Sequence, residues 1–156
     1  MTPATKQLKK HKISFETLQY QHDTKASSFG LEAVEKLSLD VEQVFKTLVV
    51  CCDTEQLVVA IVPVNLKLNL KSLAKVLKVK KVKMADAKRV ETSTGYVLGG
   101  VSPLGQKKPL STVIDASAEK FEQIYVSGGR RGLEIELAPK DLCQQCQAIF
   151  ANISNS

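Results

Sequence analysis

The chain of 156 residues contains no tryptophan, and aromatic residues of all kinds make up only 5% of it. Proteins that bind single-stranded nucleic acid often stack successive bases on aromatic side chains. We therefore do not expect base stacking to be the dominant mode of recognition here. Histidine is also scarce: His11 falls in a predicted helix and His22 in a polar loop, and both are expected to be surface residues.

Long apolar runs are absent as well. The longest, residues 57–64, is far too short to span a bilayer, and the first residues contain no apolar segment of the kind found in signal peptides. Hydrophobic residues make up 44% and charged residues 24%, which is ordinary for a globular protein. We expect a cytoplasmic protein with no membrane partner, folded as one domain over residues 1–156.

The cysteines do not form a metal-binding or disulfide pattern. Cys51 and Cys52 are adjacent in an apolar strand, so their side chains point to opposite faces. Cys143 and Cys146 form a CxxC pair in a predicted C-terminal helix, without partner cysteines or histidines at zinc-site spacing. We expect all four to be free thiols in a reducing compartment, and neither a metal nor a cofactor.

Positive charge is present in excess. The formal net charge is +6 and the isoelectric point is near 9.1. Eight lysines are concentrated in residues 67–88, and Lys71, Lys75 and Lys78 would share one face of a helix. Two interpretations stay open: a solvated helix face, or a surface that contacts the phosphate backbone of a nucleic acid.

Amphipathic and apolar segments alternate along the chain. Helices are expected over residues 2–11, 28–37, 70–77 and 86–93 and from Pro139, with helical turns at 41–44 and 117–121. Strands are expected over 13–20, 45–52, 57–64, 80–84, 112–115, 124–126 and 133–137. Segments 45–52 and 57–64 predict a hairpin of buried strands, and 124–126 with 133–137 a second hairpin. The order favours an α+β fold with a mixed, mostly antiparallel, barrel-like sheet surrounded by helices.

Two helices have a predicted apolar inner side. The inward residues are Leu31, Val34 and Leu37 in the helix 28–37, and Leu142, Cys146 and Ile149 in the C-terminal helix. These spacings follow the helical period, so each set is expected to pack on the core.

Two glycine-rich loops are the most informative motifs. Residues 93–105 contain four of the eight glycines and a proline, and residues 127–132 contain three more glycines with two arginines. Neither loop has the spacing of a P-loop or a dinucleotide-binding fingerprint. Each is compatible with an ordinary turn between strands. Together they favour a pocket lined by backbone amides that can donate to an oxygen or a phosphate.

Few side chains are candidates for chemistry. Lys46 opens an otherwise apolar strand, where its ammonium reaches either solvent or a pocket that holds an anion. Ser102 lies in the first glycine loop, but no base is identifiable near it. Glu134 and Glu136 flank Ile135 and point to the same face, either as a solvent-facing pair or with one of them at a pocket edge, holding an ammonium group.

Several of these segments, taken together, resemble a known family. They are VFKTLV at 44–49, MAD at 84–86, STGY at 93–96, GGVSPLG at 99–105 and SGGRRGL at 127–133. In this order they are similar to the YbaK family of free-standing aminoacyl-tRNA deacylases and to the editing domain inserted in bacterial prolyl-tRNA synthetases. The resemblance extends over nearly the whole chain.

The resemblance implies a trans-editing deacylase that removes cysteine from Cys-tRNA(Pro) and also from Cys-tRNA(Cys), with aminoacyl-tRNA and prolyl-tRNA synthetase as partners. In this family the lysine that matches Lys46 is the essential catalytic residue, which binds the terminal phosphate or polarises the carbonyl. The substrate's own thiol attacks its ester carbonyl and releases a thiolactone, a lyase-like reaction rather than a hydrolysis. The substrate-binding residues implied are Tyr20, Phe29, Thr47, Gly99, Gly100, Ser102 and Glu134.

Within that set the implied roles differ. Amides around residues 99–102, among them Gly99, Gly100 and Ser102, would support the oxyanion, and Glu134 would contact the α-ammonium group. Two alternatives remain: a deacylase for another small amino acid, such as Ala-tRNA(Pro), that uses water, or a non-catalytic RNA- or synthetase-binding module. The lysine-rich segment and the lack of a nucleophile–base pair favour the latter.

Overall fold

The computed structural model describes residues 1–26 and 28–156; Ser27, part of the polar loop before the second predicted helix, lies outside the described residues. The helices are α1 (Pro3–Lys10), α2 (Phe29–Leu37), η1 (Val41–Gln43), α3 (Leu70–Leu77), α4 (Ala87–Thr94), η2 (Ala116–Lys120) and α5 (Pro139–Cys146). The strands are β1 (Glu16–Gln19), β2 (Phe45–Cys52), β3 (Leu57–Pro63), β4 (Lys67–Leu68), β5 (Val82–Met84), β6 (Ser111–Asp115), β7 (Ile124–Ser127), β8 (Leu133–Leu137), β9 (Ile149–Ala151) and β10 (Ser154–Asn155).

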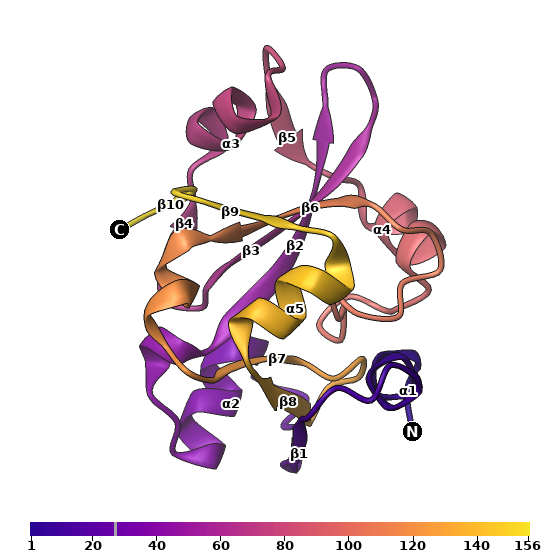
Figure 1. The fold of residues 1–156 in the computed structure, drawn as a ribbon, viewed down its shortest axis with the longest axis vertical. Helices are drawn as coiled ribbons and strands as arrows, with labels where there is room; N and C mark the ends of the chain where they lie inside the picture. The colour runs from indigo at the N-terminus through magenta and orange to yellow at the C-terminus, as the bar shows by residue number, and fades with distance from the viewer. Residues whose placement is uncertain (27) are drawn as a thin grey trace.

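A five-stranded sheet forms the centre of the molecule, in the order β5-β2-β3-β6-β9 (Figure 1). β2 pairs antiparallel with β3 and β5, whereas β3–β6 and β6–β9 are parallel. Every residue of β3 is buried, because the sheet is covered on both faces and a continuous apolar run suits that position. Cys51 and Cys52 belong to the two opposite apolar clusters, as their adjacency predicts.

A second, antiparallel sheet has the order β1-β8-β7 and packs against the first near the start of β2. Val44 forms an isolated parallel bridge with Tyr125 between the two sheets. The mixed, mostly antiparallel α+β fold is confirmed. The sheets do not close into one barrel, so "barrel-like" describes them only loosely. Helices in the described part of the chain lack the length and apolar character that crossing a bilayer requires.

Two predictions about inward side chains are wrong. In α2, Leu31 is 44% exposed, whereas Glu32 and Ala33 are buried and Val34 and Leu37 half-buried. Glu32 faces inward because its carboxylate accepts hydrogen bonds from groups on that side of the helix. α5 ends before Ile149, which lies in β9 and is 53% exposed.

Some strand boundaries also differ. β1 begins at Glu16, three residues later than expected, and β4, β9 and β10 are not predicted at all. β4 and β10 have two residues each, too few to show an alternating pattern.

The two glycine-rich loops pack on each other. A Cβ on Gly100 would lie 2.9 Å from the Cα of Arg130, and one on Gly129, where φ is +109°, would lie 2.8 Å from the ring of Tyr96. Glycine at these positions therefore allows the 97–105 and 127–132 backbones to approach closely. Their contact forms one wall of a cavity.

Candidate active site

A cavity of about 310 Å³ lies where the start of β2, the start of α2, the first glycine loop and the β7–β8 hairpin meet. Six residues predicted from the sequence line it: Tyr20, Phe29, Lys46, Thr47, Gly99 and Glu134. The cavity thus brings together residues that lie up to 114 positions apart in the chain, from Tyr20 to Glu134.

Gly100 and Ser102 do not line this cavity. The amide of Gly100 donates to the carbonyl oxygen of Val97 at 3.0 Å. Ser102 is fully buried, and its Oγ accepts a hydrogen bond from the amide of Leu104 at 3.2 Å. Both residues thus hold the shape of the glycine loop. Val101, which the sequence reasoning did not single out, lines the cavity instead.

Lys46 is one of two cations among the described residues that line the cavity; the other is the exposed Arg130. Lys46 is the second residue of β2 and half-buried, next to Phe45, whose side chain is in the core. Among the described residues its ammonium group forms neither an ion pair nor a hydrogen bond. Burial lowers the pKa of Lys46. A partly desolvated cation without a counter-charge is well suited to bind an anion.

Glu134 is the acid of the cavity. It is only 7% exposed and lies in the middle strand of the small sheet, opposite Leu18 of β1 and Ser127 of β7. No described residue donates a hydrogen bond to its carboxyl group. Burial raises the pKa of Glu134 to about 8, so the group is largely neutral at pH 7. The interpretation of Glu134 as part of a solvent-facing pair is therefore wrong.

Two further polar groups face this region. The Oγ1 atom of Thr47 is buried and has no hydrogen-bond partner among the described residues. Burial and the nearby Glu134 charge raise the pKa of Tyr20 to about 12, so its hydroxyl group stays protonated. Buried polar groups are normally hydrogen-bonded, and exceptions often mark a ligand position.

An aromatic–cation contact lies beside the cavity, at its lining residue Phe29. The guanidinium carbon of Arg131 lies 4.5 Å from the ring centroid of Phe29, and its Nη2 donates to the carbonyl oxygen of Leu98 at 2.8 Å. Gly99 lies beneath this pair with φ at +87°, and a Cβ there would come within 2.7 Å of both side chains. A larger residue at position 99 would push the Arg131 and Phe29 side chains apart.

A polar cluster holds α2 in place beside the cavity. Glu32 accepts hydrogen bonds from the His22 ring at 2.7 Å, the Asp23 amide at 2.7 Å and Lys36 at 2.9 Å. Burial alone would raise the pKa of Glu32, but these three donors outweigh it and lower the pKa to about 2. The His22 ring lies 5.5 Å from that of Phe29, and its side chain is only 15% exposed, so the expectation of a surface histidine is wrong.

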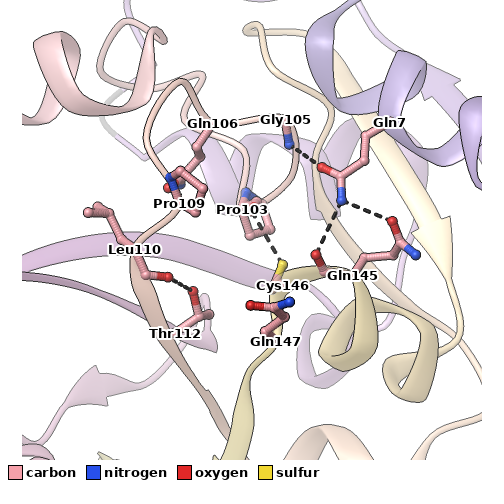
Figure 2. A pocket seen from close by; sticks show the side chains of 10 residues that line it. All are labelled: Gln7, Pro103, Gly105, Gln106, Pro109, Leu110, Thr112, Gln145, Cys146 and Gln147. Atoms are coloured by element: carbon pink, nitrogen blue, oxygen red, sulfur yellow. Dashed lines mark hydrogen bonds between the residues drawn. The ribbon is translucent and has the colours of Figure 1, made fainter.

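A different cavity, of about 320 Å³, lies between α1, α5 and the loop before β6 (Figure 2). It is lined by uncharged residues. Its thiol, Cys146, donates to the carbonyl oxygen of Pro103 at 3.3 Å, and burial raises the pKa of that thiol to about 12. A thiol that stays protonated is a poor nucleophile. The cavity around Lys46 is therefore the candidate active site.

The cysteines lie away from this site. Cys51 and Cys52 are buried in the central sheet, all four cysteines are free, and none lines the Lys46 cavity. The described residues contain no group of three or more His, Cys, Asp or Glu side chains placed to hold a metal ion. Residues that line the cavity include no histidine either, so they offer no pairing of a nucleophile with a histidine base.

Comparison with known families agrees with this site. Residues 25–144 match the aminoacyl-tRNA editing domain family, which covers most of the chain, the whole first glycine loop and Lys46. The chain belongs to the aminoacyl-tRNA editing domain family. Its substrate class is therefore aminoacyl-tRNA, and the resemblance seen in the sequence motifs is confirmed.

Individual relatives support the assignment. The chain is 37% identical over 154 residues to EbsC of Enterococcus faecalis, a protein provisionally named as a Cys-tRNA(Pro)/Cys-tRNA(Cys) deacylase; the match covers 98% of this chain and 93% of the relative. It is 25% identical over 113 residues to YwhH of Bacillus subtilis, which has no described function, across 72% of this chain and 71% of that protein.

Solved structures show the same fold. The hypothetical protein APE2540 superposes with a TM-score of 0.88 at 25% identity, over 99% of this chain and all of the other. A structure provisionally described as a trans-editing enzyme for prolyl-tRNA synthetase superposes with a TM-score of 0.84 at 20% identity, over 100% of this chain and 99% of the other.

Proposed function

We propose that the protein deacylates Cys-tRNA(Pro) and Cys-tRNA(Cys), and that the cysteine of the substrate supplies the attacking sulfur. The observation that carries this proposal is the composition of the cavity. Among the described residues its lining includes two cations without an ion-pair partner, the half-buried Lys46 and the exposed Arg130, and no cysteine or histidine. The likeness to EbsC supports cysteine as the amino acid.

The reaction then needs little covalent chemistry from the protein. The cysteinyl thiol loses its proton, and the sulfur attacks the ester carbonyl carbon of the same residue to form a tetrahedral oxyanion. This intermediate collapses with cleavage of the bond to the ribose oxygen, which takes up a proton. The products are uncharged tRNA and cysteine thiolactone. Cleavage is lyase-like on this route, and water hydrolyses the thiolactone afterwards.

The protein supplies positioning and charge. Lys46 binds the terminal phosphate or polarises the ester carbonyl, where positive charge stabilises the developing oxyanion. Because the Gly100 amide is bonded within its loop, we assign the remaining oxyanion donors to the amides of Gly99 and Val101, which border the cavity. Holding the thiol near the carbonyl makes the attack intramolecular and lowers its entropic barrier.

Glu134 binds the α-ammonium group in this proposal. Burial leaves the carboxyl group mostly neutral, and no described residue forms an ion pair with it, so a positively charged partner is missing. A bound ammonium group supplies that missing charge and shifts Glu134 to its ionised form. The Thr47 hydroxyl and the Tyr20 ring border the same space and limit the size of the aminoacyl side chain.

Selectivity follows from the mechanism as well as from the size of the cavity. A small cavity discriminates weakly between amino acids that differ by one group. Serine has almost the shape of cysteine but a poorer nucleophile, and alanine has none, so both esters should be cleaved far more slowly. We further propose that prolyl-tRNA synthetase is the partner that selects the tRNA, because a chain of 156 residues is too small to contact both ends of a tRNA.

The experiment is a turnover assay with catalytic amounts of protein on Cys-, Ser- and Ala-charged tRNA(Pro), with mass spectrometry of the released product. We expect multiple turnovers on Cys-tRNA(Pro), slow cleavage of the other two, and thiolactone as the first product. Faster cleavage of Ala-tRNA(Pro) would assign the protein to alanine editing with water. An absence of turnover on all three would identify a binding module.

A further inference from the structure

A groove of about 260 Å³ lies directly beside the candidate active site, between α1 and β1. Arg130 lines both the groove and the Lys46 cavity, so the two are continuous at this exposed side chain. The far side of the groove is formed by Thr5 and Lys9 of α1, one helical turn apart, and its floor by Phe15.

Hydrogen bonds anchor α1 at its N-terminus and at its middle. The hydroxyl of Thr2, the N-cap residue, donates to the carbonyl oxygen of Gly128 at 2.5 Å, in the loop that carries Arg130. Farther along, Gln7 accepts from the Gly105 amide at 2.6 Å and donates to the Gln145 side chain at 2.9 Å (Figure 2). The groove is therefore built on anchored elements, not on loosely attached side chains.

The charge of this groove suits an anionic chain. Residues 1–12 contain four lysines, Lys6, Lys9, Lys10 and Lys12, and no acidic residue. Lys9 and Arg130 are both exposed, and neither forms an ion pair among the described residues. Glu16, at the opposite edge of the groove, is acidic and exposed.

The size of the active-site cavity requires such an exit. Pockets that enclose a drug-sized ligand measure roughly 300–1,000 Å³, so a cavity of about 310 Å³ holds an aminoacyl group and little of the nucleotide chain. The rest of the RNA strand must leave across the protein surface. Within the lysine-rich residues 67–88, β5 pairs with residues 50–52 at the opposite end of β2, about 13–20 Å from Lys46 at the rise of an extended strand. Figure 1 shows α3 and β5 at that end, away from α2, β7 and β8.

We propose that the groove between α1 and β1 binds the phosphates of the single-stranded 3′ end of the substrate RNA, through Lys9 and Arg130. The proposal rests on aminoacyl-tRNA being the substrate. The terminal nucleotide enters the Lys46 cavity past Arg130, and the preceding phosphates follow the groove toward Lys9. Contacts of this kind are electrostatic and therefore weaken with salt.

The test measures binding of uncharged tRNA, which requires no deacylation. The variant is Lys9→Ala/Arg130→Gln. Its control is Lys71→Ala/Lys75→Ala, which also removes two positive charges, but from an exposed face of α3. We expect the Kd of the groove variant to rise roughly tenfold, and the slope of log K against log salt to fall by about 1.4 for two single-strand phosphate contacts. The control should change Kd less than about twofold, and Glu16→Gln should tighten binding.

A second RNA separates the groove from general charge effects. For tRNA that lacks its single-stranded 3′ end, wild type and groove variant should bind with the same Kd. Truncating the RNA and substituting Lys9 and Arg130 remove the same contact, so the second change has no further effect. The proposal would be overturned if the control variant lost as much affinity for tRNA as the groove variant, or if the Kd of the groove variant were unchanged. So would weaker binding to prolyl-tRNA synthetase with RNA binding unchanged. A protein that binds tRNA through the groove but fails to deacylate any of the charged tRNAs refutes the proposed function alone.

Discussion

Glu32 and Glu134 are both buried glutamates, 6% and 7% exposed, but their surroundings differ. Glu32 receives hydrogen bonds from His22, Asp23 and Lys36, and its pKa is lowered to about 2. Glu134 receives none among the described residues, and burial raises its pKa to about 8. The fold satisfies the first carboxylate with three hydrogen bonds, whereas we propose that the second is satisfied by the α-ammonium group of the substrate.

Lys36, which pairs with Glu32, and Lys46, which lines the same cavity as Glu134, differ in the same way. Lys36 donates to Glu32 at 2.9 Å and to the carbonyl oxygen of Gln21. Lys46 has no partner in the described part of the chain, and burial lowers its pKa. Satisfied charges fix the position of α2, whereas unsatisfied ones mark the candidate active site. Variants of the two regions should therefore affect different properties.

The largest effect on activity is expected from Lys46→Ala. Removing a charge that stabilises the oxyanion should lower kcat/KM on Cys-tRNA(Pro) by roughly a hundredfold to a thousandfold, with the thermal midpoint unchanged. The matched variant Lys36→Ala should do the reverse, losing about 1 kcal/mol of stability with activity largely retained. Near-normal activity of Lys46→Ala would remove this residue from the mechanism.

Glu32→Gln should cause the largest loss of stability. Removing the charge while keeping the shape leaves Lys36 and His22 without their partner, so the free energy of unfolding should fall by about 2–4 kcal/mol at pH 7. Because the folded pKa, about 2, lies below the unfolded value of 4.5, the stabilisation is present above pH 4.5 and is lost as the pH falls toward 2. Urea unfolding at pH 7 and at pH 3 measures both effects. Identical unfolding curves for variant and wild type at pH 7 would show that the hydrogen bonds to Glu32 do not stabilise the fold.

Glu134→Gln should give the opposite response. The folded pKa, about 8, lies above the unfolded value of 4.5, so the neutral carboxyl group favours folding below pH 4.5 and that advantage is lost as the pH rises through 8. At pH 8 the variant should therefore be more stable than wild type, by about 1–3 kcal/mol. Its kcat/KM on Cys-tRNA(Pro) should fall roughly tenfold, because the ammonium group loses its partner. Lower stability at pH 8 would show that Glu134 is satisfied in the fold.

Replacing all four cysteines by alanine should have the smallest effect on activity. None of them lines the Lys46 cavity, so kcat/KM should stay within about threefold of wild type. Cys51 and Cys52 are buried, so the variant is assayed well below its thermal midpoint. Complete loss of turnover in a folded variant would place the nucleophile in the protein.

Local patterns predicted much of the fold. The apolar runs predicted β2 and β3 as buried neighbours, and the cap residues Ser28 and Asn69 predicted where α2 and α3 begin. Their side chains accept hydrogen bonds from the third residue beyond each cap, which depends only on nearby sequence. Strands of two or three residues, such as β10 and β9, depend on distant partners and leave no periodic signal.

The candidate site likewise contains residues that local sequence predicted and features that it could not predict. Glycine spacing and the lone cation pointed to Gly99 and Lys46, since both are unusual in their local context. The burial of Glu134 could not be predicted, because alternation tells which face a residue is on but not what covers that face. Two of the three partners of Glu32, His22 and Asp23, come from a loop about ten residues away, and Arg130 reaches the cavity only through the packing of two loops.

The most direct test of the account compares deacylation of Cys-tRNA(Pro) with that of the same tRNA carrying S-methylcysteine. Methylation leaves the ester, the ammonium group and the RNA intact and blocks only the sulfur. If the substrate provides the nucleophile, the methylated ester should be cleaved no faster than in the absence of protein. Cleavage of both esters at the same rate would contradict the account.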